Sequence, residues 1–518
     1  MNNWGDGFPE WTELGQDSGL DPLGMQRPIE AIYQSLLPGI STITLRYRYY
    51  SFFSWVLKYY EDNIRNTDPA VFRVFQRRCE TLFALICCRG EQELGIAGSD
   101  WAHRMLGEIS GQTGAALVDF SVGADPDAEI SLRYLRNKGG AFGGIYASQM
   151  LEMGLIIIPD QEQDNPIPIC TERALPLAAA YDSELSSQAR TFFETVEMGA
   201  VSISTLDMLQ VMKPTSIRSY SDEHRLLKEI LLGKSATPST ADVMRRSTLL
   251  MLLELADVRE GILRGEDAKW YWYETSACDG DGAGRSGDSD VQQLWALYQA
   301  CDLMRLAYEA ILSAALTLLE AAPLRRMTLD VLVDELVGFI APPDDLSWKD
   351  YVQQLLSKDE PAAARRHSAA MLDAIASGAT ADQVKASLLL IAALIDEASD
   401  LTALMGNALS AAEHFQSLKS EVRFLQSSNA DNARSVIASM IRNRILKRHL
   451  WVASRKFRNQ KAYTFLMEPE EGVLRYRDHF RVSPSSPRLD QALRFLKDIM
   501  LIDDGGVTSL GRAEMSAA

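Results

Sequence analysis

The residues best suited to chemistry form a run of cations between positions 432 and 467. This window holds nine basic side chains and no Asp or Glu: Arg434, Arg442, Arg444, Lys447, Arg448, Arg455, Lys456, Arg458 and Lys461. The whole chain has a formal charge of −18 and this window contributes +9. The residues outside the window therefore carry −27. Such segregation of charge is typical of a surface that binds phosphates.

The spacing of these cations fits one face of a helix. Four of them recur at helical intervals, with apolar residues opposite: Arg444, Lys447, Arg448 and Arg455 against Ile441, Leu446 and Leu450. One face could therefore follow a DNA backbone with low sequence specificity while the other face packs. The alternative is that these cations pair with acidic helices of the same chain or of a partner protein. The sequence leaves both possibilities open.

Three more cations, Arg133, Arg136 and Lys138, stand beside a segment with the element order of a winged helix. We expect helices at 131–137 and 145–153, strands at 155–159 and 167–170 around a turn at 160–165, and a helix opening at 171. The text QMLEMGLIIIPD, followed by PICTERALPLAAAY, resembles the winged-helix DNA-binding domains of bacterial regulators. The resemblance implies that the helix at 144–153 enters the major groove with the three cations beside it. Because that helix has no Lys or Arg, docking of a protein is the alternative.

A second winged-helix-like element is expected near position 500. A helix at 487–500 is followed by a segment at 501–511 that has the pattern of a hairpin, with Asp503, Asp504, Gly505 and Gly506 at its turn.

Other motifs that could carry chemistry are incomplete. The glycine run at 139–144 lacks the GK[ST] ending of a P-loop and follows no strand, so we interpret it as a turn between helices. The Asp/Gly loop has Ala283 and Asp290 where an EF-hand needs an oxygen ligand and a bidentate Glu, which favours a flexible linker. Neither the six histidines nor the six cysteines have the spacing of a metal site. We therefore predict no metal, no cofactor and no catalytic residue.

The segment Asp222, Glu223 and His224, with Lys228, has charged side chains resembling part of a metal-nuclease site. Nuclease carboxylates usually lie on strands, whereas this segment is predicted to begin a helix. There Ser221 would cap the helix and the acidic residues would suit its dipole.

The elements that must position these residues are mainly helical. We expect the segment 42–63 to form a helix with a wide aromatic face, followed by a helix at 70–89. Helically spaced aromatic residues favour a core, and the alternative is stacking of unpaired bases together with Arg46 and Arg48. Helices are also predicted through 190–265 and 291–449, whereas the aromatic run at 270–273 alternates like a strand.

Length and composition limit the number of domains and the class of protein. A chain of 518 residues is too long for one hydrophobic core, and 47% hydrophobic with 24% charged residues is the balance of a folded multidomain protein. We predict six segments: an N-terminal arm and aromatic helical domain (1–128), a winged-helix-like element (129–185), a helical region (186–274), a flexible loop (275–290), a helical scaffold (291–430), and a basic helix with the C-terminal element (431–518). No apolar run is long enough for a membrane span and the opening residues do not resemble a secretory signal, so a cytoplasmic location is expected.

The text GLDPLGM, followed by LLPGISTITLRYRYYSFFSW, resembles the opening of large uncharacterised bacterial proteins found in anti-phage defence islands. The resemblance implies a cytoplasmic protein that works beside an ATPase or nuclease encoded nearby. It transfers no catalytic residues.

The sequence thus predicts a mainly α, multidomain helical protein with one or two winged-helix-like elements. We expect a non-enzymatic subunit that engages DNA or acts as a scaffold in a multiprotein defence complex, with no membrane partner. One alternative is a metal-dependent nuclease whose carboxylates come from distant segments. The other is a winged-helix transcriptional regulator.

Overall fold

The computed structural model describes residues 21–517 apart from 91–92, 110–115, 160–166, 260, 278–287, 357–362 and 406–415. The described residues are mainly α-helical, with only short antiparallel strands, which confirms the predicted fold class. Within them, no helix has both the length and the apolar character that a membrane crossing needs. Most of the predicted loop at 275–290 lies outside the described residues.

The chain forms two compact units, and each is assembled from two separate stretches of sequence. Unit 1 comprises Met1–Gln34 and Lys269–Ser486, and unit 2 comprises Ser35–Ala268 and Pro487–Ala518. The borders between the units are not among the boundaries of the six predicted segments, which remain a prediction.

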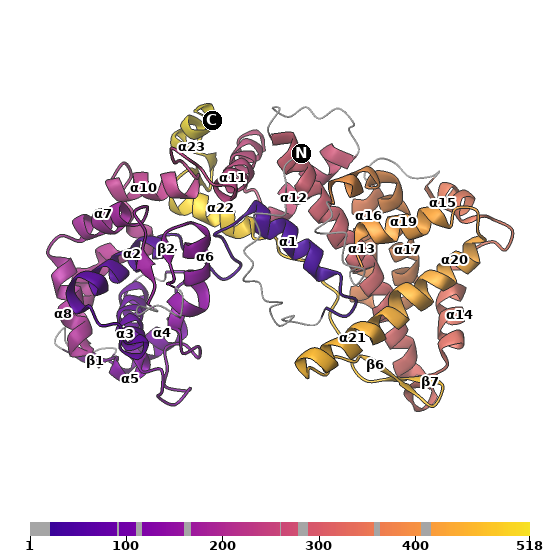
Figure 1. Ribbon diagram of the computed structural model, residues 1–518, viewed down its shortest axis with the longest axis horizontal. Coiled ribbons are helices and arrows are strands. Elements are labelled where there is room, and N and C mark those ends of the chain that lie inside the picture. The colour runs from indigo at the N-terminus through magenta and orange to yellow at the C-terminus, as the bar shows by residue number, and fades with distance from the viewer. Residues whose placement is uncertain are drawn as a thin grey trace. The chain divides into compact units, whose positions relative to one another are not determined.

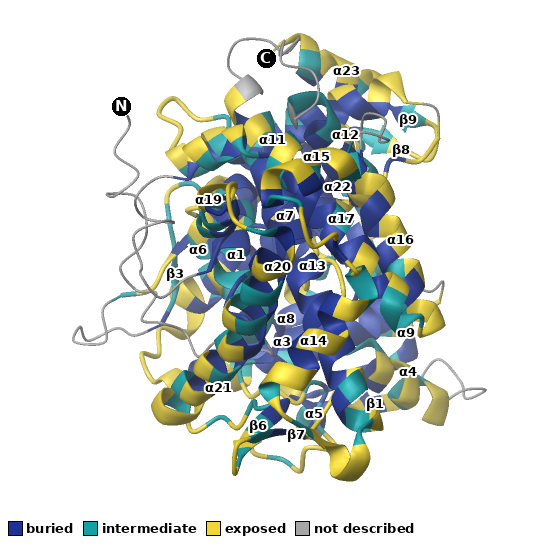
Figure 2. Cartoon of the chain, turned by 90° about the vertical axis from the view of Figure 1, so that its right-hand side faces the viewer, coloured by how far each residue is buried: buried dark blue, intermediate teal, exposed yellow. Residues whose placement is uncertain are grey.

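Unit 1 is organised around one long helix, α13 (Asp288–Ala321). Its residues from Trp295 to Leu312 are buried on every side, and such all-round burial marks the centre of a helical domain (Figure 2). The surrounding helices are α14 (Leu329–Ile340), α15 (Trp348–Leu356), α16 (Ala363–Ser377), α17 (Thr380–Glu397), α19 (Leu418–Ser427), α20 (Ala433–Ser439) and α21 (Lys447–Gln460), with a π-helix η7 (Met440–Leu446) between the last two and 3-10 turns η5 (Pro323–Arg325) and η6 (Asp400–Leu404).

A small antiparallel sheet completes unit 1. It has the strand order β5 (Arg326–Met327), β7 (Val473–Tyr476) and β6 (Met467–Glu470). The β6–β7 turn consists of Glu471 and Gly472, both with positive φ (48° and 84°), as a tight hairpin turn requires. This hairpin follows α21 closely along the chain.

Unit 2 packs its helices around the aromatic face that the sequence predicted. The rings of Tyr49, Phe52 and Phe53 on α2 are at most 2% exposed, and Phe83 stacks on Phe52 at 4.2 Å between ring centroids. These rings are core, so the alternative that they stack unpaired bases is wrong. Arg46 and Arg48 are buried in ion pairs.

The elements of unit 2 appear in indigo to magenta, with its C-terminal stretch in yellow (Figure 1). The helices are α2 (Tyr49–Tyr59), α3 (Pro69–Cys88), α4 (Ser99–Glu108), α5 (Ser121–Ala124), α6 (Ala147–Glu152), α7 (Leu175–Leu185), α8 (Gln188–Met198), α9 (Ile203–Met208), α10 (Asp222–Leu231), α11 (Thr240–Val258), α22 (Leu489–Asp498) and α23 (Ser509–Ser516). Shorter pieces are the π-helices η1 (Tyr60–Ile64) and η2 (Phe142–Tyr146), the 3-10 turns η3 (Leu209–Met212) and η4 (Pro214–Ser216), and the strand pair β1 (Leu117–Asp119) and β4 (Ala200–Ser202).

Two helices span the borders between the units: α1 (Gln26–Leu36) and α12 (Gly265–Ala277). The aromatic run at 270–273 lies within α12, so the expected strand-like alternation is wrong. Trp270, Trp272 and Tyr273 are buried and Tyr271 is 45% exposed, so the alternation of a strand already fails at Tyr273.

The mid-chain segment predicted to be a winged-helix-like element has only some of the expected helices and strands. Residues 131–137 form turns and bends rather than the expected first helix. The next helix is a π-helical turn, η2, followed by the six-residue α6, and Gly154 ends it with φ +66°. Strands β2 (Ile156–Ile157) and β3 (Ile169–Cys170) pair antiparallel before α7 begins, and the expected turn at 160–165 lies outside the described residues.

The C-terminal element has the expected helix and hairpin, with a shorter return strand. Strands β8 (Ile502–Asp503) and β9 (Gly506–Val507) pair antiparallel after α22. Thr508 then caps α23 by accepting from the Gly511 amide at 3.1 Å, so residues 509–511 are helical rather than part of the hairpin. Within unit 2, α22 and α23 both contact α11.

Candidate nucleic-acid interface

The basic window folds into one continuous helical run, α20, η7 and α21. It begins where Asn432 accepts a hydrogen bond from the Ser435 amide at 3.2 Å, and no Gly or Pro interrupts it up to Gln460. Ile441 and Leu446 are buried as predicted, whereas Leu450 is only half-buried. The π-helical turn η7 adds a residue to the helical repeat, which shifts the faces of α21 relative to those of α20.

Three cations at the start of this run are paired with acidic residues of the same unit. Arg434 lies 3.1 Å from Asp344, Arg442 pairs with Asp330, and Arg444 lies 3.7 Å from the buried carboxylate of Glu421. These three cations therefore form intramolecular ion pairs, which was the alternative to binding a DNA backbone.

Arg448, His449 and Lys456 hold the backbone of residues 21–23 within unit 1. Arg448 Nε donates to the Leu23 carbonyl at 3.0 Å, and Lys456 Nζ donates to that of Asp21 at 3.4 Å. His449 Nε2 accepts from the Leu466 amide at 3.0 Å, so Nδ1 carries the proton and donates to the Pro22 carbonyl at 3.1 Å. Lys456 is 3% exposed, which removes it from the surface of the predicted phosphate-binding face.

The remaining cations gather on α21 and just beyond it. Lys447, Arg458 and Lys461 are exposed, and among the residues that the structure describes none of them has an acidic partner. The guanidinium of Arg455 lies over the Trp451 ring, 5.1 Å from its centroid. Figure 2 shows exposed residues along α21, and these four cations form what we call the α21 basic face.

The second predicted group of cations belongs to unit 2. Arg133 Nε donates to the Ala128 carbonyl at 2.8 Å, Lys138 pairs with Asp127 at 2.6 Å, and Arg136 is exposed. The expected recognition helix has Gln149 and Met150 buried, so it directs part of its surface into unit 2. The structure therefore keeps Arg133 and Lys138 near the turns that replace the first helix, each with an intramolecular partner.

The glycine run at 139–144 does bind an anion, but an internal one. The amides of Ala141 and Phe142 donate to the Glu80 carboxylate at 2.9 and 2.7 Å, and the Tyr134 hydroxyl donates to the same group. Burial raises the pKa of Glu80, and these donors act against that rise. The donors are therefore already used inside the protein.

The nuclease-like acids are also engaged. Glu223 is fully buried against Arg48, and His224 Nε2 lies 2.8 Å from the Ile499 carbonyl. Ser221 caps α10 by accepting from the His224 amide, which confirms the predicted helix start. No group of three or more His, Cys, Asp or Glu side chains in the described part of the chain is arranged to hold a metal ion.

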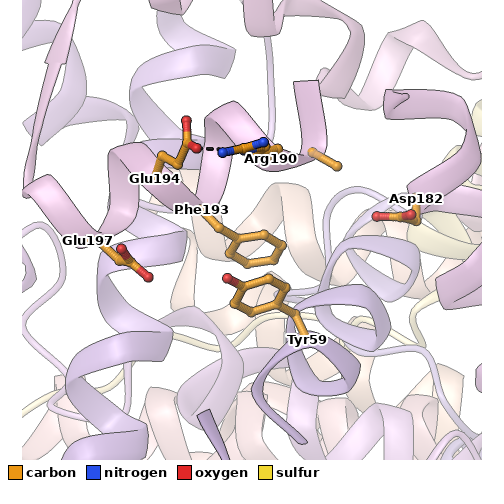
Figure 3. A pocket seen from close by; sticks show the side chains of 7 residues that line it. Tyr59, Asp182, Arg190, Phe193, Glu194 and Glu197 are labelled. Carbon is orange, nitrogen blue, oxygen red and sulfur yellow. Dashed lines mark hydrogen bonds and ion pairs between the residues drawn. The ribbon is translucent and has the colours of Figure 1, made fainter. Parts of the chain in front are cut away.

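Unit 2 has a surface cavity of about 350 Å³ between α2 and α8 (Figure 3). The rings of Tyr59 and Phe193 stack in it, and Arg190 pairs with Glu194 at 2.7 Å. Asp182, at its edge, accepts a hydrogen bond from the Trp55 indole at 2.8 Å. The residues that line the cavity include no Ser, Thr, Cys or His, so it offers no such nucleophile or imidazole base.

Sequence reasoning located the basic window but missed the aromatic residues within it. Trp451, Phe457 and Tyr463 are 40%, 49% and 52% exposed and lie on or directly after α21. The signal that could have found them is the position of these rings among cations with no acidic residue nearby in the sequence.

Comparison with known proteins gives the chain no relative: no family model matches it, and neither a curated protein nor a solved structure is significantly similar to it.

Proposed function

We propose that this protein is a non-enzymatic subunit that binds a nucleic-acid backbone through the α21 basic face. One observation carries the proposal: Lys447, Arg458 and Lys461 are exposed without acidic partners among the described residues, on α21 and directly after it, in a chain with a net charge of −18. Three other exposed cations of unit 1 lie on three separate helices: Lys349, Lys385 and Arg423. A local cluster can bind phosphates where scattered charges cannot.

The physical chemistry predicts weak binding with a steep dependence on salt. Each phosphate neutralised by a cation releases condensed counterions and contributes about −0.9 to the slope of log K against log salt on duplex DNA. Three or four cations therefore give a slope of about −3 to −4. The acidic remainder of the chain repels DNA, which favours binding in company with a partner protein.

The context of this activity is proposed from the resemblance of the opening residues. We propose a bacterial defence complex in the cytoplasm, with a neighbouring ATPase or nuclease subunit as protein partner. We propose that α6, β2, β3 and α7 act as the winged-helix-like element in this complex. Because α6 has no cation and buries Gln149 and Met150, we propose docking of protein rather than DNA there.

Fluorescence anisotropy with labelled duplex DNA tests the proposal on the full chain. The variant Lys447→Glu/Arg458→Glu/Lys461→Glu should weaken binding by at least about tenfold and flatten the salt slope by about three, measured between about 50 and about 200 mM NaCl. The matched control Lys349→Glu/Lys385→Glu/Arg423→Glu changes the net charge equally from three other helices of unit 1. Equal losses in the two variants would contradict a localised interface.

Divalent-metal-dependent cleavage by the purified protein would contradict the non-enzymatic part of the proposal. Affinity purification from the native host, with identification of co-purifying gene products and nucleic acid, tests the proposed partners.

A further inference from the structure

The exposed aromatic residues of the described chain are concentrated beside the α21 basic face. Five Trp, Phe or Tyr side chains are strongly exposed: Tyr220, Tyr271, Trp451, Phe457 and Tyr463. Three of these five lie between residues 451 and 463, within or just after α21. Large rings normally leave the solvent for a core, so a group of them on a charged surface calls for a physical reason.

The positions of the cations alone have a simple structural explanation. Arg458 and Lys461 lie at the end of α21, where the helix dipole and the last free carbonyls favour positive charge. That explanation does not extend to the rings of Phe457 and Tyr463, which are 49% and 52% exposed. A ligand for this surface must therefore suit both the cations and the aromatic rings.

The rings and guanidinium groups form a mixed surface. The Phe457 and Tyr463 rings meet edge to face, 6.2 Å apart and at 87°, so their faces point in different directions. The Arg477 guanidinium lies over Tyr463, 5.9 Å from its centroid, and the Phe465 ring is 5.4 Å from Tyr463. On the preceding turns, Arg448 and Arg455 both lie over the Trp451 ring, at 4.5 and 5.1 Å.

Lys447, Trp451 and Arg458 follow one strip of α21, at i, i+4 and i+11. With a rise of about 1.5 Å per residue, Lys447 and Arg458 are about 16 Å apart along the helix axis. Cations thus stand at both ends of a strip that has an aromatic ring between them, with Phe457 in the last turn of the helix and Tyr463 just after it.

We propose that this surface binds single-stranded nucleic acid, with unpaired bases stacking on Phe457 and Tyr463 while Lys447, Arg458 and Lys461 hold the phosphates. Single-strand binders combine a cationic track with exposed rings, and each stacked base contributes about 1–3 kcal/mol. The bases of a duplex are stacked on one another and cannot use these rings. The inference rests on the proposed function, because it needs the same basic face to reach a nucleic-acid backbone.

An acidic protein segment would satisfy the cations, but its carboxylates gain nothing from the faces of Phe457 and Tyr463. The proposal therefore commits to single-stranded nucleic acid, and an acidic polypeptide serves as the competitor in the test. DNA and RNA offer the same bases and phosphates, so both enter the test as separate probes.

The test uses the full-length protein with fluorescein-labelled oligo(dT), oligo(U) and a mixed-sequence duplex, each of about 20 nucleotides or base pairs, at one salt concentration. The variant Phe457→Ala/Tyr463→Ala should weaken binding to at least one of the single strands by about tenfold or more, leaving duplex affinity within about twofold. Tyr463→Phe keeps the ring and should retain single-strand binding. Tyr220→Ala/Tyr271→Ala removes two exposed rings elsewhere and should change nothing.

The outcomes separate this inference from the proposed function. If Phe457→Ala/Tyr463→Ala binds both single strands as tightly as the wild type, or loses duplex binding equally, stacking is overturned. The proposed function still stands in that case if Lys447→Glu/Arg458→Glu/Lys461→Glu weakens all probes. If that charge variant also binds every probe normally, both are overturned. If poly-glutamate displaces oligo(dT) at equal charge concentration, the choice of single-stranded nucleic acid as the ligand is overturned. If the protein prefers either oligo(dT) or oligo(U), that choice is supported.

Discussion

Arg48 and Glu223 form a bidentate ion pair in the interior of unit 2. Arg48 Nε and Nη2 donate to the two carboxylate oxygens at 2.9 and 2.8 Å, and the two side chains are 1% and 0% exposed. The second terminal nitrogen of Arg48 donates to the carbonyls of Val211 and Lys213, both at 2.6 Å. Glu223, which the sequence places in a nuclease-like group, is thereby committed to an internal arginine.

Removing Glu223 should destabilise the protein strongly. Glu223→Ala leaves the Arg48 guanidinium buried without its counter-charge, and breaking one partner of a buried pair costs about 3–5 kcal/mol. Urea denaturation followed by circular dichroism measures the shift in midpoint. The neighbouring Asp222, whose side chain is 79% exposed, provides the control: Asp222→Ala should shift the midpoint little. A small shift for Glu223→Ala would contradict the structural role of the pair.

The glycine run offers a second matched pair of substitutions. Gly140 has φ +68°, and a Cβ there would overlap the Glu80 carboxylate, so Gly140→Ala should cost at least about 2 kcal/mol. Gly143 lies in η2 with open space around its Cα, so Gly143→Ala should be neutral or stabilising by about 0.5–1 kcal/mol. Thermal unfolding measures the stability of the two variants. If the glycine run were an ordinary turn with no carboxylate packed against it, the two substitutions would change the stability by similar amounts.

His449 should make stability depend on pH. Burial lowers its pKa to about 4, from about 6.5 in the unfolded chain, so between these values only the unfolded state takes up the proton. The contribution of neutral His449 is complete above about pH 6.5 and falls as the pH drops towards about 4, by about 3 kcal/mol in all.

The comparison of wild type with His449→Asn at pH 7.5 and 4.5 isolates this contribution from that of the carboxylates. The substitution should cost more stability at the higher pH, because the wild type loses its advantage in acid. His479→Asn, which alters a 42% exposed ring, is the matched control and should cost little stability at pH 7.5. A cost of His449→Asn that is equal at both pH values would contradict burial of a neutral imidazole.

Cations within the basic window should not be equivalent in binding. Lys447→Ala should weaken duplex DNA binding by about threefold and reduce the salt slope by about 0.9, because an unpaired cation is lost. Arg442→Ala should change binding much less, since Asp330 already neutralises that guanidinium. Anisotropy titrations at several salt concentrations measure both quantities. If the two variants lose affinity equally, the ion pair does not persist in solution.

The sequence predicted the helices and the aromatic core because their residues interact over short separations. The helix at 131–137 failed for a long-range reason: the carbonyls of Leu135, Asn137 and Lys138 accept hydrogen bonds from the buried guanidinium of Arg77. In a helix at 131–137 these carbonyls would lie in the last turn or just after it, where they have no intrahelical partner. Arg77, which is distant in sequence, binds them in the observed turns, and local pattern does not show this.

The same limit applies to the basic window. Its position and charge were evident from the sequence, but the acids that neutralise part of it, Asp330, Asp344 and Glu421, come from α14, from the segment after α14, and from α19. Which cations remain unpaired therefore depends on how helices far apart in the chain pack together. The exposed rings were missed for a related reason, since sequence alone does not tell a core aromatic residue from a surface one.

Because unit 2 is built from two separate stretches of sequence, its folding during synthesis on the ribosome is delayed. Asp498 accepts from the Arg46 side chain and the Tyr47 amide, and the Phe495 ring lies 4.8 Å from that of Tyr47. These partners emerge only after all of Lys269–Ser486 has been translated. Until then a nascent chain leaves part of its aromatic interior uncovered. Unit 2 therefore cannot complete its aromatic interior until all residues of unit 1 have been synthesised.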